Sequence, residues 1–120
     1  MRFVVQYHIC DDEHYDFMIE AEEALVTFRI PINDLQDMQN GSEIRAEKIQ
    51  DHRKEYLEYE GPVSGGRGQV RIFDTGECKE LSGPGEGNAF FLEGRVFRGN
   101  LSIKIEGNIY RFRFTQTDAK

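Results

Sequence analysis

The segment VVQYHICDDEHYDFMIE, residues 4–20, has the most regular alternation of apolar and polar side chains in this chain. From residue 14 onward the alternation has a period of two, which is typical of a β-strand and not of a helix. It assigns two sets of side chains to opposite faces: Tyr15, Phe17 and Ile19 on one, and His14, Asp16, Met18 and Glu20 on the other. Residues 3–8 alternate in the same way, so the segment predicts two neighbouring strands.

Two of the three histidines of the chain lie in these strands. If the strands pair, residues 9–13 connect them, and His8, His14 and Asp16 converge on one face. Two imidazoles and one carboxylate form a ligand set that suits a divalent transition metal such as Mn, Fe or Zn. The alternative is that these polar residues form the solvent-facing side of an antiparallel strand pair.

The two cysteines, Cys10 and Cys78, are distant in sequence and belong to no CxxC pair, so we expect free, reduced thiols. Cys10 lies between the proposed ligand histidines, and a zinc site made with His14 is a second interpretation. A lone C-x₃-H pattern is a weak signal for zinc, so the set of two histidines and one aspartate is preferred.

The rest of the chain is also rich in strand signals. After a third strand at residues 24–30, Asn33 and Gly41 bracket a predicted short helix. A strand at residues 45–49 leads to Asp51 and His52, and a polar turn or single helical turn follows at residues 53–59. The second half predicts strands at 69–74, 77–81, 89–92, 95–98, 101–106 and 109–115, with tight turns at 74–76, 99–100 and 107–108. This pattern predicts an all-β, mainly antiparallel fold, a small closed or nearly closed β-barrel with one short helix.

Length and charge limit the function. The 120 residues suffice for a single domain, residues 1–120, and we expect a monomer. A net charge of -7 does not suit a protein that grips many phosphates of a DNA backbone, although an enzyme that touches only a strand end needs few such contacts. No segment is typical of a signal peptide or a membrane span, so we expect a cytoplasmic protein with no membrane partner.

Several motifs of the chain resemble the 3′-phosphoesterase domain of bacterial DNA ligase D. The family's opening strand and its H-Y-D-F motif are similar to FVVQYH at residues 3–8 and HYDFMIE at residues 14–20, with the same spacing between the histidines. Its aspartate-histidine pair, the tyrosine four residues later and a glutamate-glycine pair are similar to Asp51-His52, Tyr56 and Glu60-Gly61. The resemblance extends from about Arg2 to Phe114. The first motif is specific, whereas the glycine-rich and C-terminal parts would be weak signals alone.

The resemblance implies a β-barrel enzyme that uses Mn²⁺, with Zn²⁺ as the alternative, to remove a 3′ phosphate or a terminal ribonucleoside from a DNA primer strand during repair. It assigns the metal to His8, His14 and Asp16, and the scissile phosphate to the catalytic residues His52 and Tyr56. The implied partners are a nucleic-acid 3′ end and a repair ligase or polymerase.

One departure from the family pattern concerns phosphate binding. Met18 occupies the position of a family arginine, and methionine cannot replace a guanidinium as a phosphate clamp. We expect Arg29 or Arg45 to supply the missing contact, with Arg53 and Arg67 as further candidates. The loss of the arginine also favours two alternatives: a metalloenzyme of the same fold with a different small-molecule substrate, or a non-catalytic binding protein.

Overall fold

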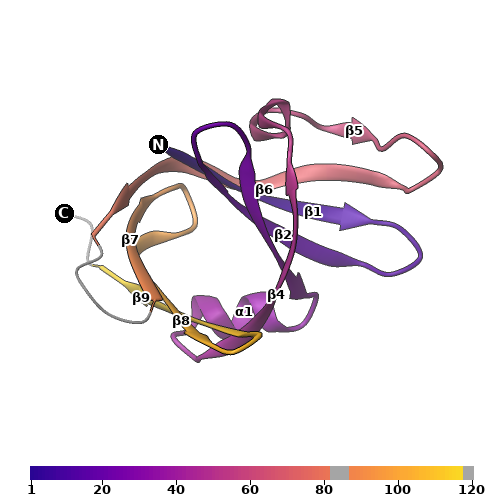
Figure 1. The fold of residues 1–120 in the computed structure, drawn as a ribbon. Helices are drawn as coiled ribbons and strands as arrows, with labels where there is room; N and C mark the ends of the chain where they lie inside the picture. Colours follow the sequence, from indigo (N-terminus) through magenta and orange to yellow (C-terminus); the bar gives the residue numbers. More distant parts are fainter. Residues whose placement is uncertain (82–86, 118–120) are drawn as a thin grey trace.

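The computed structural model describes residues 1–81 and 87–117 and confirms the all-β, antiparallel fold (Figure 1). Its described strands are β1 (Arg2–Ile9), β2 (His14–Glu20), β3 (Leu25–Pro31), β4 (Ile44–His52), β5 (Gly61–Pro62), β6 (Gln69–Glu80), β7 (Gly87–Glu93), β8 (Arg98–Glu106) and β9 (Ile109–Gln116). One α-helix, α1 (Asp34–Gln39), and one 3₁₀ turn, η1 (Lys54–Leu57), complete the described elements.

Eight of the strands form a closed barrel. They follow the order β1-β2-β3-β4-β9-β8-β7-β6, and pairing of β1 with β6 closes the ring. The short β5 pairs with β6 outside this ring. Closure removes the exposed strand edges that would otherwise pair with other chains.

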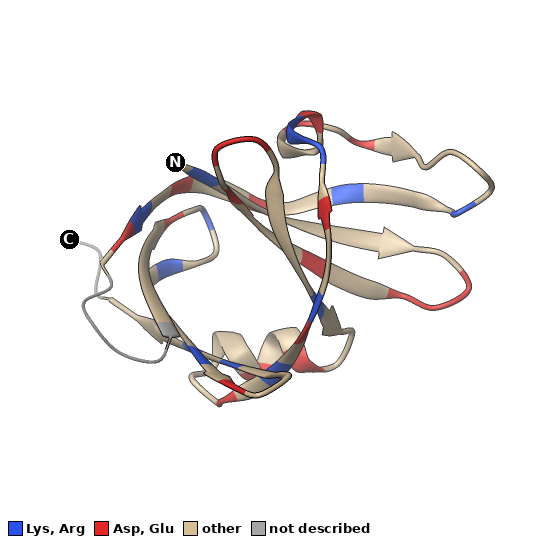
Figure 2. Cartoon of the chain, in the orientation of Figure 1, with Lys and Arg blue, Asp and Glu red and all other residues tan. Residues whose placement is uncertain are grey.

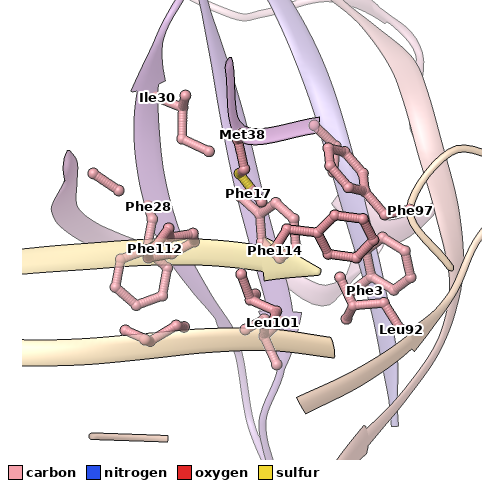
Figure 3. Close-up of a cluster of buried hydrophobic side chains, with 14 of the residues drawn as sticks. Phe3, Phe17, Phe28, Ile30, Met38, Leu92, Phe97, Leu101, Phe112 and Phe114 are labelled. Atoms are coloured by element: carbon pink, nitrogen blue, oxygen red, sulfur yellow. The ribbon is translucent and has the colours of Figure 1, made fainter. Parts of the chain in front are cut away.

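Aromatic rings fill the inside of the barrel (Figure 3). Phe17 lies at the centre, with ring centroids 5.7 Å from Phe3, 6.1 Å from Phe97 and 5.8 Å from Phe112. Helix α1 adds the buried Leu35 and Met38 to the same core. This helix has only six residues, and no described helix is long and apolar enough to cross a membrane.

The opposite face of β1, β2 and β3 carries a second, smaller apolar cluster. Val4 lies across from Met18 in the β1–β2 register, and Leu25 and Leu57 pack against this pair. Leu57 belongs to η1, so the predicted turn after β4 is one 3₁₀ turn that covers the outer face of the strands. The solvent-facing interpretation is wrong, because His14 is 4% exposed and Asp16 is 2% exposed.

The turn predicted at residues 74–76 is wrong, because β6 continues through it from Gln69 to Glu80. Asp-x-Gly is typical of a tight turn, but here Asp74 is fully buried and its carboxylate accepts hydrogen bonds from three backbone N–H groups. Two of these donors, Arg95 and Phe97, lie in the segment predicted as the strand 95–98. Residues 95–97 of that segment belong to the connection between β7 and β8, so the backbone N–H groups of Arg95 and Phe97 bond to Asp74 instead of to a neighbouring strand.

Of the other two tight-turn predictions, one is confirmed and one is wrong. Gly107 has a φ of 62° in the turn between β8 and β9, where the sequence predicts one. The turn predicted at residues 99–100 is wrong, because both residues pair with β7 and β9 within β8.

Candidate metal centre

The three predicted ligands meet where β1 and β2 pair. His8 lies directly opposite His14 at the end of the ladder, and Asp16 lies one same-face position along, opposite Gln6. Nδ1 of His8 is 3.2 Å from Nε2 of His14, and the Asp16 carboxylate oxygens are 3.8 Å and 3.4 Å from these two nitrogens. Two imidazole nitrogens and a carboxylate therefore converge on one point.

Backbone carbonyls orient both rings. Nε2 of His8 is 2.7 Å from the carbonyl oxygen of Arg67, and Nδ1 of His14 is 3.1 Å from that of Asp12. A carbonyl only accepts a hydrogen bond, so each of these nitrogens carries a proton. In the neutral rings the two nitrogens that face each other then both present lone pairs, which repel unless a cation lies between them. This arrangement, a ligand histidine whose other nitrogen donates to a carbonyl, is common around protein-bound metals.

The Asp16 carboxylate also fits a bound cation. Its Oδ1 atom is buried and has no hydrogen-bond partner among the described residues. A buried carboxylate oxygen without a hydrogen bond is costly, and a coordinated metal would satisfy it. The donor set and this unsatisfied oxygen therefore fit a divalent metal held by His8, His14 and Asp16.

Cys10 adds a sulfur atom to the same place. Its Sγ lies with the histidine nitrogens in a group of three candidate ligand atoms, all within 4.8 Å of one another. The thiol donates to the Asp12 carbonyl, 2.9 Å away, which is also the carbonyl that orients His14. The sequence offers Cys10 only as the weaker alternative, and the structure brings it beside the preferred ligands.

A pocket of about 630 Å³ opens beside the metal ligands. Five residues with polar or charged side chains line it, each from a different element: His8, Asp16, Arg29, His52 and Tyr56. The rings of His52 and Tyr56 lie edge to face, with centroids 5.6 Å apart. Nδ1 of His52 lies 3.1 Å from the Gln50 carbonyl, which leaves Nε2 as the nitrogen that can meet a substrate. The pocket thus unites two of the predicted metal ligands, His8 and Asp16, with both predicted phosphate-handling residues, while His14 lines the adjoining hollow.

Gln6 is a positioning residue that the sequence analysis misses. Its side chain is 1% exposed, and Nε2 donates to the carbonyls of Tyr56 and Tyr59, both 3.0 Å away. These bonds fix η1 and the following residues against β1, so they hold Tyr56 at the pocket. A glutamine on the ligand face of β1 is the available signal, but its partners lie 50 and 53 residues away in sequence.

The candidate arginines differ in whether they line the pocket. Arg29 lies opposite Asp16 in the β2–β3 register, and its Nε is 3.9 Å from Oδ1 of Asp16. It lines both the pocket and an adjoining hollow of about 430 Å³, whereas Arg45 lines only the hollow. Arg53 and Arg67 line the pocket. Met18 is fully buried beneath Leu57, so a side chain at that position lies under η1.

Acidic residues lie on one side of this site. Figure 2 shows that they fill the loop between β1 and β2, where Asp11, Asp12 and Glu13 are exposed. The positive residues at the pocket, Arg29, Arg53 and Arg67, come from separate segments of the chain. This distribution suits contact with one or two phosphates and disfavours binding along a long nucleic-acid backbone.

Known proteins share this domain. The family model described as the DNA ligase D 3′-phosphoesterase domain matches residues 6–117. The multifunctional non-homologous end joining protein LigD of Pseudomonas aeruginosa is 30% identical over 110 residues, which cover 89% of this chain and 12% of that protein. The multifunctional non-homologous end joining DNA repair protein LigD of Mycobacterium tuberculosis is 36% identical over 77 residues, or 62% of this chain and 10% of that protein. The chain thus spans about a tenth of the length of these relatives.

Proposed function

The chain belongs to the DNA ligase D 3′-phosphoesterase domain family, and we therefore propose that it is a metal-dependent phosphoesterase or phosphodiesterase acting on nucleic-acid 3′ ends in DNA repair. The observation that carries this proposal is the convergence of His8, His14 and Asp16 beside a pocket lined by His52 and Tyr56. The relatives are described as end-joining proteins, which supports a substrate at a strand end.

Each residue has a distinct part in the proposed reaction. His8, His14 and Asp16 would hold the metal, which neutralises charge on phosphate oxygens and lowers the pKa of a bound water. His52 would use Nε2 to donate a hydrogen bond to a phosphate oxygen or to the leaving oxygen. The Tyr56 hydroxyl, from the adjacent 3₁₀ turn, would orient the same phosphate.

Arg29 would replace the guanidinium that the family places at the position of Met18. Arg29 and Met18 lie on the neighbouring strands β3 and β2. In their register Asp16 pairs with Arg29, and Met18 pairs with Thr27. Arg29 Nε is buried without a hydrogen-bond partner among the described residues, while 40% of the side chain is exposed at the pocket. A phosphate bound beside Asp16 would supply the missing acceptor.

The test is to strip the protein of metal, restore Mn²⁺, Zn²⁺ or Mg²⁺ one at a time, and measure metal occupancy together with phosphate release from a 3′-phosphate DNA primer. We expect occupancy and release with Mn²⁺, and no release from the same primer carrying its phosphate at the 5′ end. His52→Ala is the matched control, because it should keep the metal and lose turnover. Occupancy without release would instead favour a different substrate or a binding role, for which the acidic loop is the supporting observation.

Arg29 and Arg45 give a matched pair of variants. Arg29→Gln should lower kcat/KM about 10–100-fold, since hydrogen bonds to charged groups contribute about 1.5–3 kcal/mol. Arg45→Gln should change it by less than about threefold, because Arg45 lines only the adjoining hollow and exposed charge contacts contribute about 0–1 kcal/mol. Steady-state kinetics with the 3′-phosphate primer measures both values. Equal losses in the two variants would contradict the assignment of the phosphate to Arg29.

We further propose that the protein works in the cytoplasm as a monomer, together with a repair ligase or polymerase. The description of the relatives as multifunctional end-joining proteins supports the repair partner. Mn²⁺ is the proposed metal of the active state.

A further inference from the structure

We propose that Cys10 is a fourth ligand that makes the metal centre prefer thiophilic ions such as Zn²⁺ and closes it to substrate when such an ion is bound. This inference rests on the metal centre that the proposed function requires, and not on phosphate ester hydrolysis itself. Its starting point is the group of Cys10 Sγ with the ring nitrogens of His8 and His14, all within 4.8 Å of one another.

The backbone holds Cys10 in this position. The Asp12 carbonyl accepts from both the Cys10 thiol and Nδ1 of His14, so one atom orients the sulfur and the imidazole together. Asp16 Oδ1, buried and without a hydrogen-bond partner among the described residues, lies 3.4 Å from Nε2 of His14 and is an independent sign that a cation belongs here.

Gly68 permits the close approach of β6 to this end of β1. It has a φ of +80°, and a Cβ at this position would lie 2.0 Å from the Ile9 carbonyl oxygen and 2.9 Å from Cys10 Cβ. The neighbouring Arg67 carbonyl orients His8. The segment that orients one histidine therefore also packs directly against Cys10.

The donor types predict which ion gains from the sulfur. Mn²⁺ favours oxygen donors and keeps open positions for water and substrate, whereas thiolate ligands favour Zn²⁺. Two imidazole nitrogens, one carboxylate oxygen and one thiolate would complete a tetrahedral zinc site, and zinc sites with four protein ligands leave no open position. When the sulfur–metal bond forms, the S–H bond breaks, the proton goes to solvent and the hydrogen bond to Asp12 is lost.

Metal binding alone tests this inference, without any nucleic acid. Co²⁺ added to the metal-free protein should produce an intense near-ultraviolet sulfur-to-cobalt charge-transfer band, and Cys10→Ser should remove that band. The same variant should bind Zn²⁺ at least about tenfold more weakly, measured by competition with a chromophoric chelator, since even the loss of an outer-shell partner costs about 10–100-fold. Its affinity for Mn²⁺ should change by less than about threefold. Cys78→Ala is the matched control and should keep the band.

Thiol labelling of the unaltered protein gives a second measurement that needs no variant. Cys78 is 3% exposed, and burial raises the pKa of its thiol to about 11, so labelling reports on Cys10. Zn²⁺ should protect Cys10 from alkylation, and Mn²⁺ at equal occupancy should not.

The outcomes separate this inference from the proposed function. Zn²⁺ binding without the cobalt band or without protection of Cys10 would overturn the inference and leave the metal-dependent phosphoesterase in place. Equal losses of Zn²⁺ and Mn²⁺ affinity in Cys10→Ser would also overturn it. If neither ion binds the unaltered protein, both the inference and the proposed function fail.

Discussion

Asp16→Asn is expected to abolish metal binding and to lower phosphate release at least about a thousandfold, because metal ions contribute several kcal/mol to transition-state stabilisation. The same change should leave the metal-free protein at least as stable as the parent. The carboxylate is 2% exposed, its Oδ1 has no hydrogen-bond partner among the described residues, and the nearest cationic group is Arg29 Nε at 3.9 Å, so a neutral amide removes a buried charge that a metal would satisfy better. Few substitutions at a buried polar residue are expected to stabilise, which makes the result diagnostic.

Thermal unfolding with and without Mn²⁺ measures this effect directly. A metal that binds only the folded state stabilises it by about 2.7 kcal/mol at a hundredfold excess over Kd, so the parent should show a clear rise in Tm and Asp16→Asn should show none. Asp51→Asn is the matched control, since Asp51 lines the same pocket but is ion-paired with Lys48 and largely exposed. A metal-dependent rise in Tm that persists in Asp16→Asn would remove Asp16 from the ligand set.

Asp74→Ala is expected to lower the free energy of unfolding by about 4 kcal/mol, a large fraction of the about 5–15 kcal/mol typical of a domain. Oδ1 of Asp74 accepts from the backbone N–H groups of Thr75 and Arg95, at 2.9 Å and 2.7 Å, and Oδ2 accepts from that of Phe97 at 2.8 Å. Alanine would leave these donors unpaired and open a hole beside the buried Phe97, and each unsatisfied buried group costs about 1–3 kcal/mol.

Urea denaturation measures the loss, and an unchanged m-value would confirm that the fold is retained. Asp74→Asn should lose about half as much, because one carbonyl oxygen remains as an acceptor while the amide N–H₂ replaces the other. Asp37→Asn, at an exposed position of α1, is the control and should stay within about 0.5 kcal/mol of the parent. A loss below about 1 kcal/mol in Asp74→Ala would contradict the view that this carboxylate organises the β7–β8 connection.

The strand predictions succeeded and failed for identifiable reasons. Alternation identified β1, β2 and β9, because a period of two is a local property that survives in the folded protein. The turn predicted at residues 74–76 and the strand predicted at 95–98 failed, because Asp74 and the backbone of a distant connection satisfy each other. A pattern of turn residues cannot reveal that its carboxylate has partners more than twenty residues away.

For the candidate site, the sequence by itself determined the ligand face. The spacing between His8 and His14, with Asp16 two residues on, places all three on one side of any antiparallel pair in this register, since side chains alternate along a strand. His52 and Tyr56, at the end of β4 and in η1, were assigned to the phosphate by the family resemblance and not by periodicity.

Only the tertiary structure decided that this face is buried, which nitrogen of each histidine points inward, and which arginine reaches the pocket. Leu57 and Gln6 join η1 to β1, the Arg67 carbonyl orients His8 across 59 residues, and the β2–β3 register puts Arg29 beside Asp16. These contacts join segments far apart in the chain, so no local pattern encodes them. Periodicity fixes the direction of a side chain within its strand, whereas burial, tautomer and charge pairing depend on what the closed barrel brings against it.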